Sequence, residues 1–70
     1  MENKKQLTVN HQITHFSGNT VLDLMVENRL SEKPGFAVAV NDQVVPKGEW
    51  NTFNLQAGDN ILIINPTQGG

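Results

Sequence analysis

The sequence predicts a small α+β fold in which one helix packs across one face of a mixed sheet of four to five strands. Short runs of β-type alternation flank one segment of helical periodicity, and such a helix needs a sheet face on which to bury its apolar stripe. The chain has 70 residues, enough for one domain with a small core. We expect this domain to span residues 1–66 and a flexible tail to span residues 67–70.

The first two strands are predicted from the N-terminal part of the chain. Apolar and polar residues alternate over residues 7–9, and a second β-type run follows over residues 13–16. The polar residues 10–12 between the two runs indicate a hairpin. Residues 1–6 are expected either to fray or to lengthen the first strand.

A helix is predicted over residues 21–30. Thr20 fits its N-cap, and Asp23, three residues further on, fits the carboxylate of a capping box. The stripe expected to face the sheet consists of Leu22, Val26 and Leu30 at i+4 spacing, widened by Val21 and Met25. Residues 32–35 should end the helix, because proline disfavours helical backbone in the residue before it.

The second half of the chain contains the remaining strands. Residues 36–40 form a β-rich run in which Phe36, Val38 and Val40 share one face and Ala37 and Ala39 share the other. Asn41 and Asp42 tolerate positive φ and predict a two-residue turn into a strand over residues 43–46.

The last strand is predicted over residues 61–64. A connection over residues 47–51 and a possible short strand over residues 52–55 precede it. A turn over residues 57–60 leads into it, and Pro66 stops it.

Composition excludes several classes of function. The chain has 5 basic and 7 acidic residues and no basic stripe, so neither nucleic acid nor an acidic membrane is expected as a partner. It has no cysteine, which excludes a disulfide scaffold, a thiolate zinc site and a thiol nucleophile. His11 and His15 lie four apart in predicted β structure, where they would not converge, so no metal site is expected. No apolar stretch is long enough to span a bilayer, and a cytoplasmic location is expected.

Four motifs occur in a fixed order in the second half of the chain. They are the run Val-Asn-Asp-Gln-Val-Val-Pro at 40–46, Trp50, Gly58-Asp59 and the terminal Gly69-Gly70. No motif is specific alone, but their order and spacing in so short a chain resemble the thiamine-biosynthesis sulfur carriers of the ThiS family. The resemblance covers residues 7–70 and implies a ubiquitin-like β-grasp fold.

The C-terminal carboxylate of Gly70 is the reactive group that this chain offers. It is ionised at neutral pH and can attack the α-phosphate of ATP if a partner enzyme supplies the nucleotide and neutralises its charge. Sulfur could then displace AMP and leave a thiocarboxylate. Glycine lacks Cβ, so a tail of Thr67, Gln68, Gly69 and Gly70 could thread a narrow channel. No side chain from residue 60 to residue 70 is ionisable, so docking should depend on the folded surface and the tail backbone.

The resemblance implies a set of partners. They are a ThiF-type adenylating enzyme that uses ATP with Mg²⁺, a sulfur donor such as a cysteine desulfurase or a related protein, and a thiazole synthase that takes the sulfur. The chain would then be a co-substrate of these enzymes, would bind no cofactor itself and would be a monomer when free. The alternatives are a carrier of the molybdopterin-synthase small-subunit type, a ubiquitin-like modifier, and a β-grasp interaction module with an inert tail.

A docking face is expected on the last strand and its neighbour. Counting back from the Gly-Gly end by the ubiquitin resemblance places Ile61 and Ile63 on the core face. The side that no helix covers would then carry Leu62 and Ile64 beside Ala37 and Ala39. A covering loop is the alternative for these four residues. Trp50 is expected in the core or as a lid, and Lys47 and Glu49 in a solvated loop that could steer a partner.

Overall fold

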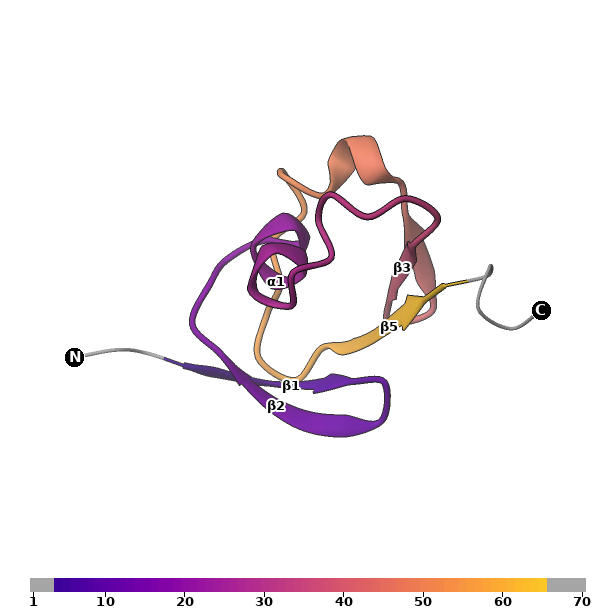
Figure 1. Cartoon of the computed structure of the whole chain (residues 1–70). Helices are drawn as coiled ribbons and strands as arrows, with labels where there is room; N and C mark the ends of the chain where they lie inside the picture. The colour runs from indigo at the N-terminus through magenta and orange to yellow at the C-terminus, as the bar shows by residue number, and fades with distance from the viewer. Residues whose placement is uncertain (1–3, 66–70) are drawn as a thin grey trace.

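The computed structural model describes residues 4–65, which form a five-stranded mixed sheet and one α-helix (Figure 1). The elements in chain order are β1 (Lys5–Val9), β2 (Gln12–Phe16), α1 (Val21–Glu27), β3 (Ala37–Val40), β4 (Gln43–Val45), the 3₁₀ turn η1 (Lys47–Glu49) and β5 (Asn60–Ile64). Within residues 4–65, no helix is long and apolar enough to cross a membrane.

The strand order in the sheet is β2-β1-β5-β3-β4. The last strand, β5, lies at the centre, parallel to β1 and antiparallel to β3. Both outer pairs are hairpins, and α1 lies across one side of the sheet (Figure 1). The predicted α+β class, with one helix on a mixed sheet, is confirmed.

Both hairpins have two-residue turns with left-handed backbone. Asn10 and His11 have φ of 50° and 69°, and Asn41 and Asp42 have φ of 51° and 71°. Positive φ at both turn residues is typical of two-residue hairpin turns, because their backbone twist matches the twist of the two strands that they join. The first turn is one residue shorter than predicted. At the other end of β1 the strand begins at Lys5, so residues 5 and 6 lengthen it beyond the predicted start at Leu7.

The predicted capping box at the start of α1 is present. The Thr20 hydroxyl accepts a hydrogen bond from the Asp23 N–H at 3.2 Å, and the Asp23 carboxylate accepts from the Thr20 N–H at 3.0 Å. The same carboxylate accepts from the Asn19 N–H at 2.9 Å. The hydrogen bonds from Asn19 and then Thr20 hold the pKa of Asp23 below its usual value, because they favour the ionised form.

The helix is shorter than predicted, since it ends at Glu27. Arg29 adopts φ of 62°, and its N–H and that of Leu30 donate backward to the carbonyls of Val26 and Met25 at 2.9 and 2.8 Å. This pattern is a Schellman cap, which terminates a helix through one left-handed residue. The chain therefore leaves the helix before residues 32–35, which were predicted to end it.

The buried side of α1 also differs from the prediction. Its buried residues are Val21, Leu24 and Met25, whereas Val26 is 55% exposed. Leu22 is only partly buried against the core. The predicted stripe is therefore confirmed at Val21 and Met25 and wrong at Val26, and the prediction missed Leu24, which is fully buried.

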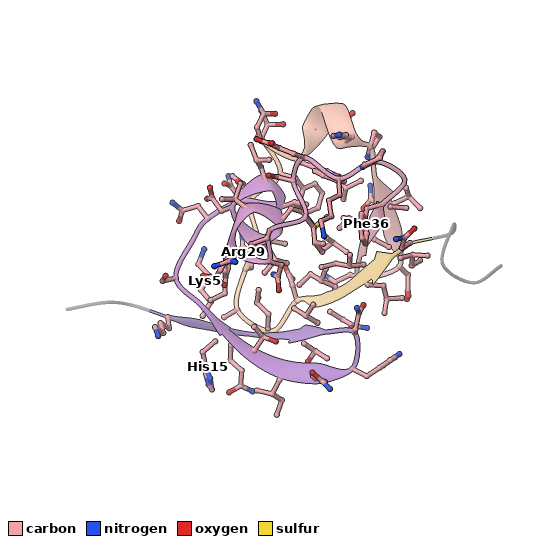
Figure 2. All side chains as sticks on the ribbon, viewed as in Figure 1. Lys5, His15, Arg29 and Phe36 are labelled. Atoms are coloured by element: carbon pink, nitrogen blue, oxygen red, sulfur yellow. The ribbon has the colours of Figure 1, made fainter. Side chains whose placement is uncertain are left out.

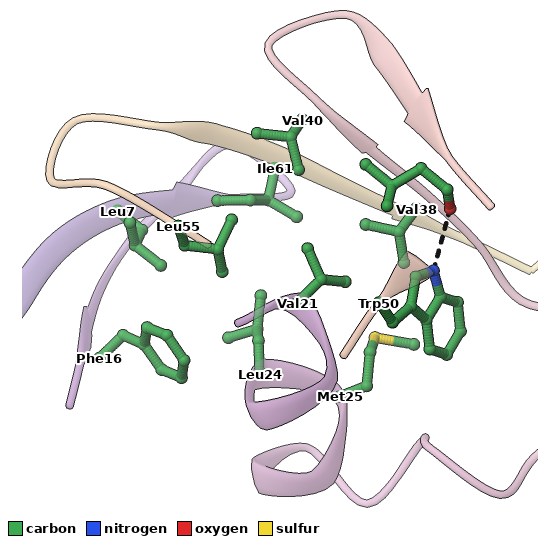
Figure 3. Packing of buried hydrophobic residues seen from close by; sticks show 11 residues of the cluster. Leu7, Phe16, Val21, Leu24, Met25, Val38, Val40, Trp50, Leu55 and Ile61 are labelled. Carbon is green, nitrogen blue, oxygen red and sulfur yellow. Dashed lines mark hydrogen bonds between the residues drawn. The ribbon is translucent and has the colours of Figure 1, made fainter. Parts of the chain in front are cut away.

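The core lies between α1 and the sheet (Figure 3). Its buried members are Leu7, Phe16, Val21, Leu24, Met25, Val38, Val40, Val45, Trp50, Leu55 and Ile61. Trp50 is 2% exposed, and its indole N–H donates to the Val45 carbonyl at 3.0 Å, the dashed line in Figure 3. Of the two predicted roles for this residue, the structure shows the core role.

The segment between η1 and β5 is mostly irregular. The short strand predicted over residues 52–55 is absent, and only an isolated bridge joins Asn54 to Thr20. The Val21 N–H donates to the Phe53 carbonyl at 3.0 Å, and the Leu55 N–H donates to the Asn19 carbonyl at 2.7 Å. The backbone groups of Phe53 and Leu55 thus form hydrogen bonds with the residues at the start of α1 and do not pair in the sheet. This explains why the predicted strand does not form.

Candidate docking face and chain terminus

The four residues of the expected docking face are neighbours in the sheet. Ala37 pairs with Ile64, and Ala39 pairs with Leu62, across the antiparallel β3 and β5. The alternating residues of the same strands face the core: Ile61 is fully buried. Ile64 is 49% exposed, so this part of the sheet is open to solvent within the described structure.

Val44 belongs to the same surface, although the sequence analysis did not identify it. It lies on β4 opposite Ala39, and its side chain is 69% exposed. Val44, Ala39 and Leu62 therefore form one row across three strands. Alternation requires that only one of the adjacent Val44 and Val45 faces the core, and the structure shows that Val45 is the buried one.

We call this surface the open face and define it as Ala37, Ala39, Val44, Leu62 and Ile64. None of these side chains is ionisable. Ala39 lies between Val44 and Leu62, and Ala37 lies beside Ile64, so a partner could approach the sheet backbone closely at these two small residues. An exposed apolar patch of this kind is typical of a protein interaction site.

The charged residues of η1 lie next in the chain after β4. The Lys47 ammonium is 5.9 Å from the centroid of the Trp50 ring, within the range of a cation–π contact. The Glu49 carbonyl accepts a hydrogen bond from the Thr52 hydroxyl at 3.2 Å. Lys47 and Glu49 are both exposed, as predicted.

The predicted tail residues Thr67, Gln68, Gly69 and Gly70 lie outside the described residues. The described chain ends at Asn65, directly after β5. Gly70 is five residues further on, a reach of about 17 Å for an extended chain. The strand that carries Leu62 and Ile64 is therefore the one that leads towards Gly70.

The described residues contain neither a detectable pocket nor a group of three His, Asp or Glu side chains placed to share a metal ion. The side chain of His15 points away from α1, on the outer side of β2 (Figure 2). Lys5 lies on the helix side of the sheet, where its ammonium donates to the Leu55 carbonyl at 2.9 Å.

Comparison with known proteins identifies the family. The model of the ThiS family matches residues 2–70. The chain belongs to the ThiS family. It is 29% identical over 65 residues to the sulfur carrier protein ThiS of Escherichia coli strain K12, a match that covers 93% of this chain and 98% of that protein.

A solved structure supports the fold. The thiamine biosynthesis protein (ThiS) of Geobacter metallireducens superposes with a TM-score of 0.75 and covers 84% of this chain and 90% of its own. Sequence identity in that match is 19%, so the match supports the fold alone. The predicted ubiquitin-like β-grasp fold, the predicted family and the sulfur-carrier class of function are thus confirmed.

Proposed function

We propose that this ThiS-family chain carries sulfur as a thiocarboxylate on Gly70 for thiazole formation in thiamine biosynthesis. The observation that supports this most is the extent of the family match, which runs through the terminal Gly69-Gly70. In this proposal residues 1–66 are the folded domain and residues 67–70 are the tail. The chain acts as a co-substrate, and partner enzymes supply the catalysis.

The chemistry takes place at one carboxylate. A carboxylate oxygen of Gly70 attacks the α-phosphorus of ATP, held with Mg²⁺ by a ThiF-type adenylating enzyme, and pyrophosphate leaves. A nucleophilic sulfur, delivered by a cysteine desulfurase or a related donor, then attacks the acyl carbon and displaces AMP. When the donor is a persulfide, a second thiol cleaves the resulting acyl disulfide and leaves as a disulfide with the donor cysteine; when the donor is sulfide, this step is not needed. The product in both cases is a thiocarboxylate, from which a thiazole synthase takes the sulfur.

The fold contributes a docking surface and a rigid base for the tail. The open face supplies apolar contacts next to β5, and β5 leads into the tail. Because no side chain from residue 60 onward is ionisable, the tail backbone and the open face carry the recognition. A strand-like pairing of the tail inside a channel would satisfy its backbone groups.

Intact mass spectrometry tests the proposal. The chain is incubated with ATP, Mg²⁺, sulfide and a ThiF-type enzyme, with the E. coli relative as a positive control for enzyme activity. The expected mass gain equals the exchange of one oxygen for sulfur. Deletion of Gly70 should abolish this gain and leave the circular dichroism spectrum unchanged.

An unchanged mass, under conditions in which the E. coli protein is converted, would contradict the proposal and favour an interaction module with an inert tail. Loss of folding on deletion of Gly70 would contradict the division into domain and tail. Release of AMP and pyrophosphate, measured in parallel, identifies the adenylation step.

A further inference from the structure

The central strand β5 is held at both ends by asparagine side chains from the two hairpin turns. At its start, the Asn60 N–H donates to the side-chain oxygen of Asn41 at 2.9 Å. Near its end, the Ile63 N–H donates to the side-chain oxygen of Asn10 at 2.8 Å. Asn10 and Asn41 are each the first residue of a two-residue turn, with φ of 50° and 51°.

The contact made by Asn10 takes the place of missing strand pairing. The parallel ladder between β1 and β5 ends at the pair Val9 and Ile61, and the Asn10 N–H donates to the Ile61 carbonyl at 2.9 Å. Beyond that point β1 turns away into its hairpin. The side-chain oxygen of Asn10 then accepts the next N–H of β5 on that side, that of Ile63, as a further strand residue would.

Few residue types can fill this position. The left-handed backbone at Asn10 favours glycine, asparagine and aspartate. Glycine would keep the turn but has no side chain to accept from the Ile63 N–H. Aspartate keeps both the turn preference and a side-chain oxygen, so it can preserve the contact.

We infer that Asn10 is a positioning residue for the terminal carboxylate, because it fixes the end of the strand from which the tail continues. This inference rests on the proposed function of Gly70. Ile63 lies seven residues before Gly70, and on the β3 side the last strand pair is Ala37 with Ile64. With Asn10 in place, the end of β5 is held from both sides, by the Asn10 side chain on one and by the pair with Ala37 on the other.

The expected effect is on turnover more than on binding. Asn10 is not part of the open face, so a change there leaves the docking contacts intact. A looser strand end presents the carboxylate to ATP in a wider range of directions, and misplacement of reacting atoms by about 1 Å can lower a rate by orders of magnitude. We therefore expect a lower kcat for adenylation with a nearly unchanged KM for the carrier.

The experiment compares Asn10→Gly, Asn10→Asp and Asn41→Gly with the unaltered chain. Asn41→Gly is the control, since it makes the same substitution in the turn at the far end of β5, where it removes the contact with the Asn60 N–H and also the hydrogen bond that the Asn41 amide donates to Asp59. ATP-dependent pyrophosphate release by a ThiF-type enzyme gives kcat and KM for each carrier. Amide hydrogen exchange of Ile63 and Asn60, followed by NMR, reports whether each end of β5 is still held.

Asn10→Gly should lower kcat by about three- to tenfold, with KM within about twofold, and speed exchange at Ile63. Asn10→Asp should restore both kcat and exchange protection. Asn41→Gly should speed exchange at Asn60 and leave kcat unchanged. This last result separates positioning of the tail from a general loss of stability.

Two outcomes would overturn the positioning role. One is an unchanged kcat in Asn10→Gly although exchange at Ile63 has become fast. The other is an equal fall of kcat in Asn41→Gly, which would show that only overall stability matters. Failure of the unaltered chain to be adenylated would overturn the proposed function itself, and the positioning role with it.

Discussion

The two faces of the β3–β5 pair have similar composition but opposite environments. On one face, Val38 and Ile61 are buried beneath α1. On the other, Leu62 and Ile64 lie beside two alanines, and Ile64 is half exposed. Over the four residue pairs from Val40–Ile61 to Ala37–Ile64 both faces are apolar, and strand alternation assigns neighbouring residues to opposite sides.

The difference shows that hydrophobicity alone does not distinguish a core from an interface. α1, together with Trp50 and Leu55, covers one side of the sheet, and no second α-helix within residues 4–65 covers the other side, so its apolar residues remain available to a partner. A monomeric protein rarely keeps such a patch without a function. We therefore expect substitutions on the two faces to separate stability from partner binding.

Ile61→Ala should show the largest effect on stability. Removing a buried isoleucine side chain costs the transfer free energy of the lost atoms and leaves a cavity, together about 2–5 kcal/mol. Leu62→Ala is the matched control on the open face and should cost less, because its environment is already partly solvent. Urea unfolding followed by circular dichroism measures both; equal losses would remove the distinction between the two faces.

Leu62→Asp should show the next largest effect, on affinity for the adenylating enzyme. A carboxylate in an apolar contact is desolvated without a partner charge, and we expect Kd to rise by about tenfold or more. Val44→Asp changes the other end of the row formed by Val44, Ala39 and Leu62, and it should also raise Kd. Val26→Asp places the same charge on an exposed valine of α1, away from the open face, and should leave Kd unchanged.

Titration calorimetry or surface plasmon resonance gives these affinities, and thermal melting confirms that each variant is folded. A fall in affinity for Val26→Asp as large as for Leu62→Asp would place the contact surface elsewhere. Unaltered affinity in both open-face variants would contradict the proposed docking role.

Lowering the pH should destabilise α1, which covers the buried face of the sheet. This is the smallest of the expected effects. The pKa of Asp23 is lower in the folded chain than its ordinary value of 3.8, chiefly because the Asn19 N–H donates to its carboxylate. This contribution to stability is therefore complete well above pH 3.8 and is lost as the pH falls through the folded pKa.

Melting temperatures measured between about pH 7 and pH 2 should fall more steeply for the unaltered chain than for Asp23→Asn. At neutral pH the melting temperature of the variant should be slightly lower than that of the unaltered chain, since its amide is a weaker acceptor at the helix N-terminus. Its affinity for the adenylating enzyme at pH 7 should be unchanged, because Asp23 is remote from the open face. If the melting temperatures of the two proteins fall equally as the pH is lowered, the role assigned to this carboxylate is contradicted.

Local chemistry was sufficient to predict much of the fold and part of the candidate site. Positive-φ residues placed the second hairpin turn, and Thr20 with Asp23 marked the start of the helix. Alternation placed Leu62 and Ile64 on the side opposite Ile61. Each of these features depends on residues within four positions of one another, which is why they could be predicted from the sequence alone.

Where the prediction failed, the deciding contacts lay outside the local pattern. Which apolar stripe of α1 is buried depends on where the sheet lies, and Leu24 faces it while Val26 does not. The backbone at Phe53 serves the start of α1, so the strand predicted there does not form. Val44 was missed because β4 has only three residues, too few for alternation to stand out.

By itself, the sequence determined the order of the helix and the five strands that form, the second hairpin turn, the helix N-cap and the Gly69-Gly70 pair within the part that the ThiS-family model matches. Only the tertiary structure decided that Trp50 is buried, that Val44 joins the open face, and that Asn10 reaches a strand 53 residues away. The physical reason is the separation in sequence over which each effect acts. Turn preferences and alternation act between near neighbours, whereas the surroundings of a side chain depend on which distant segments pack against it.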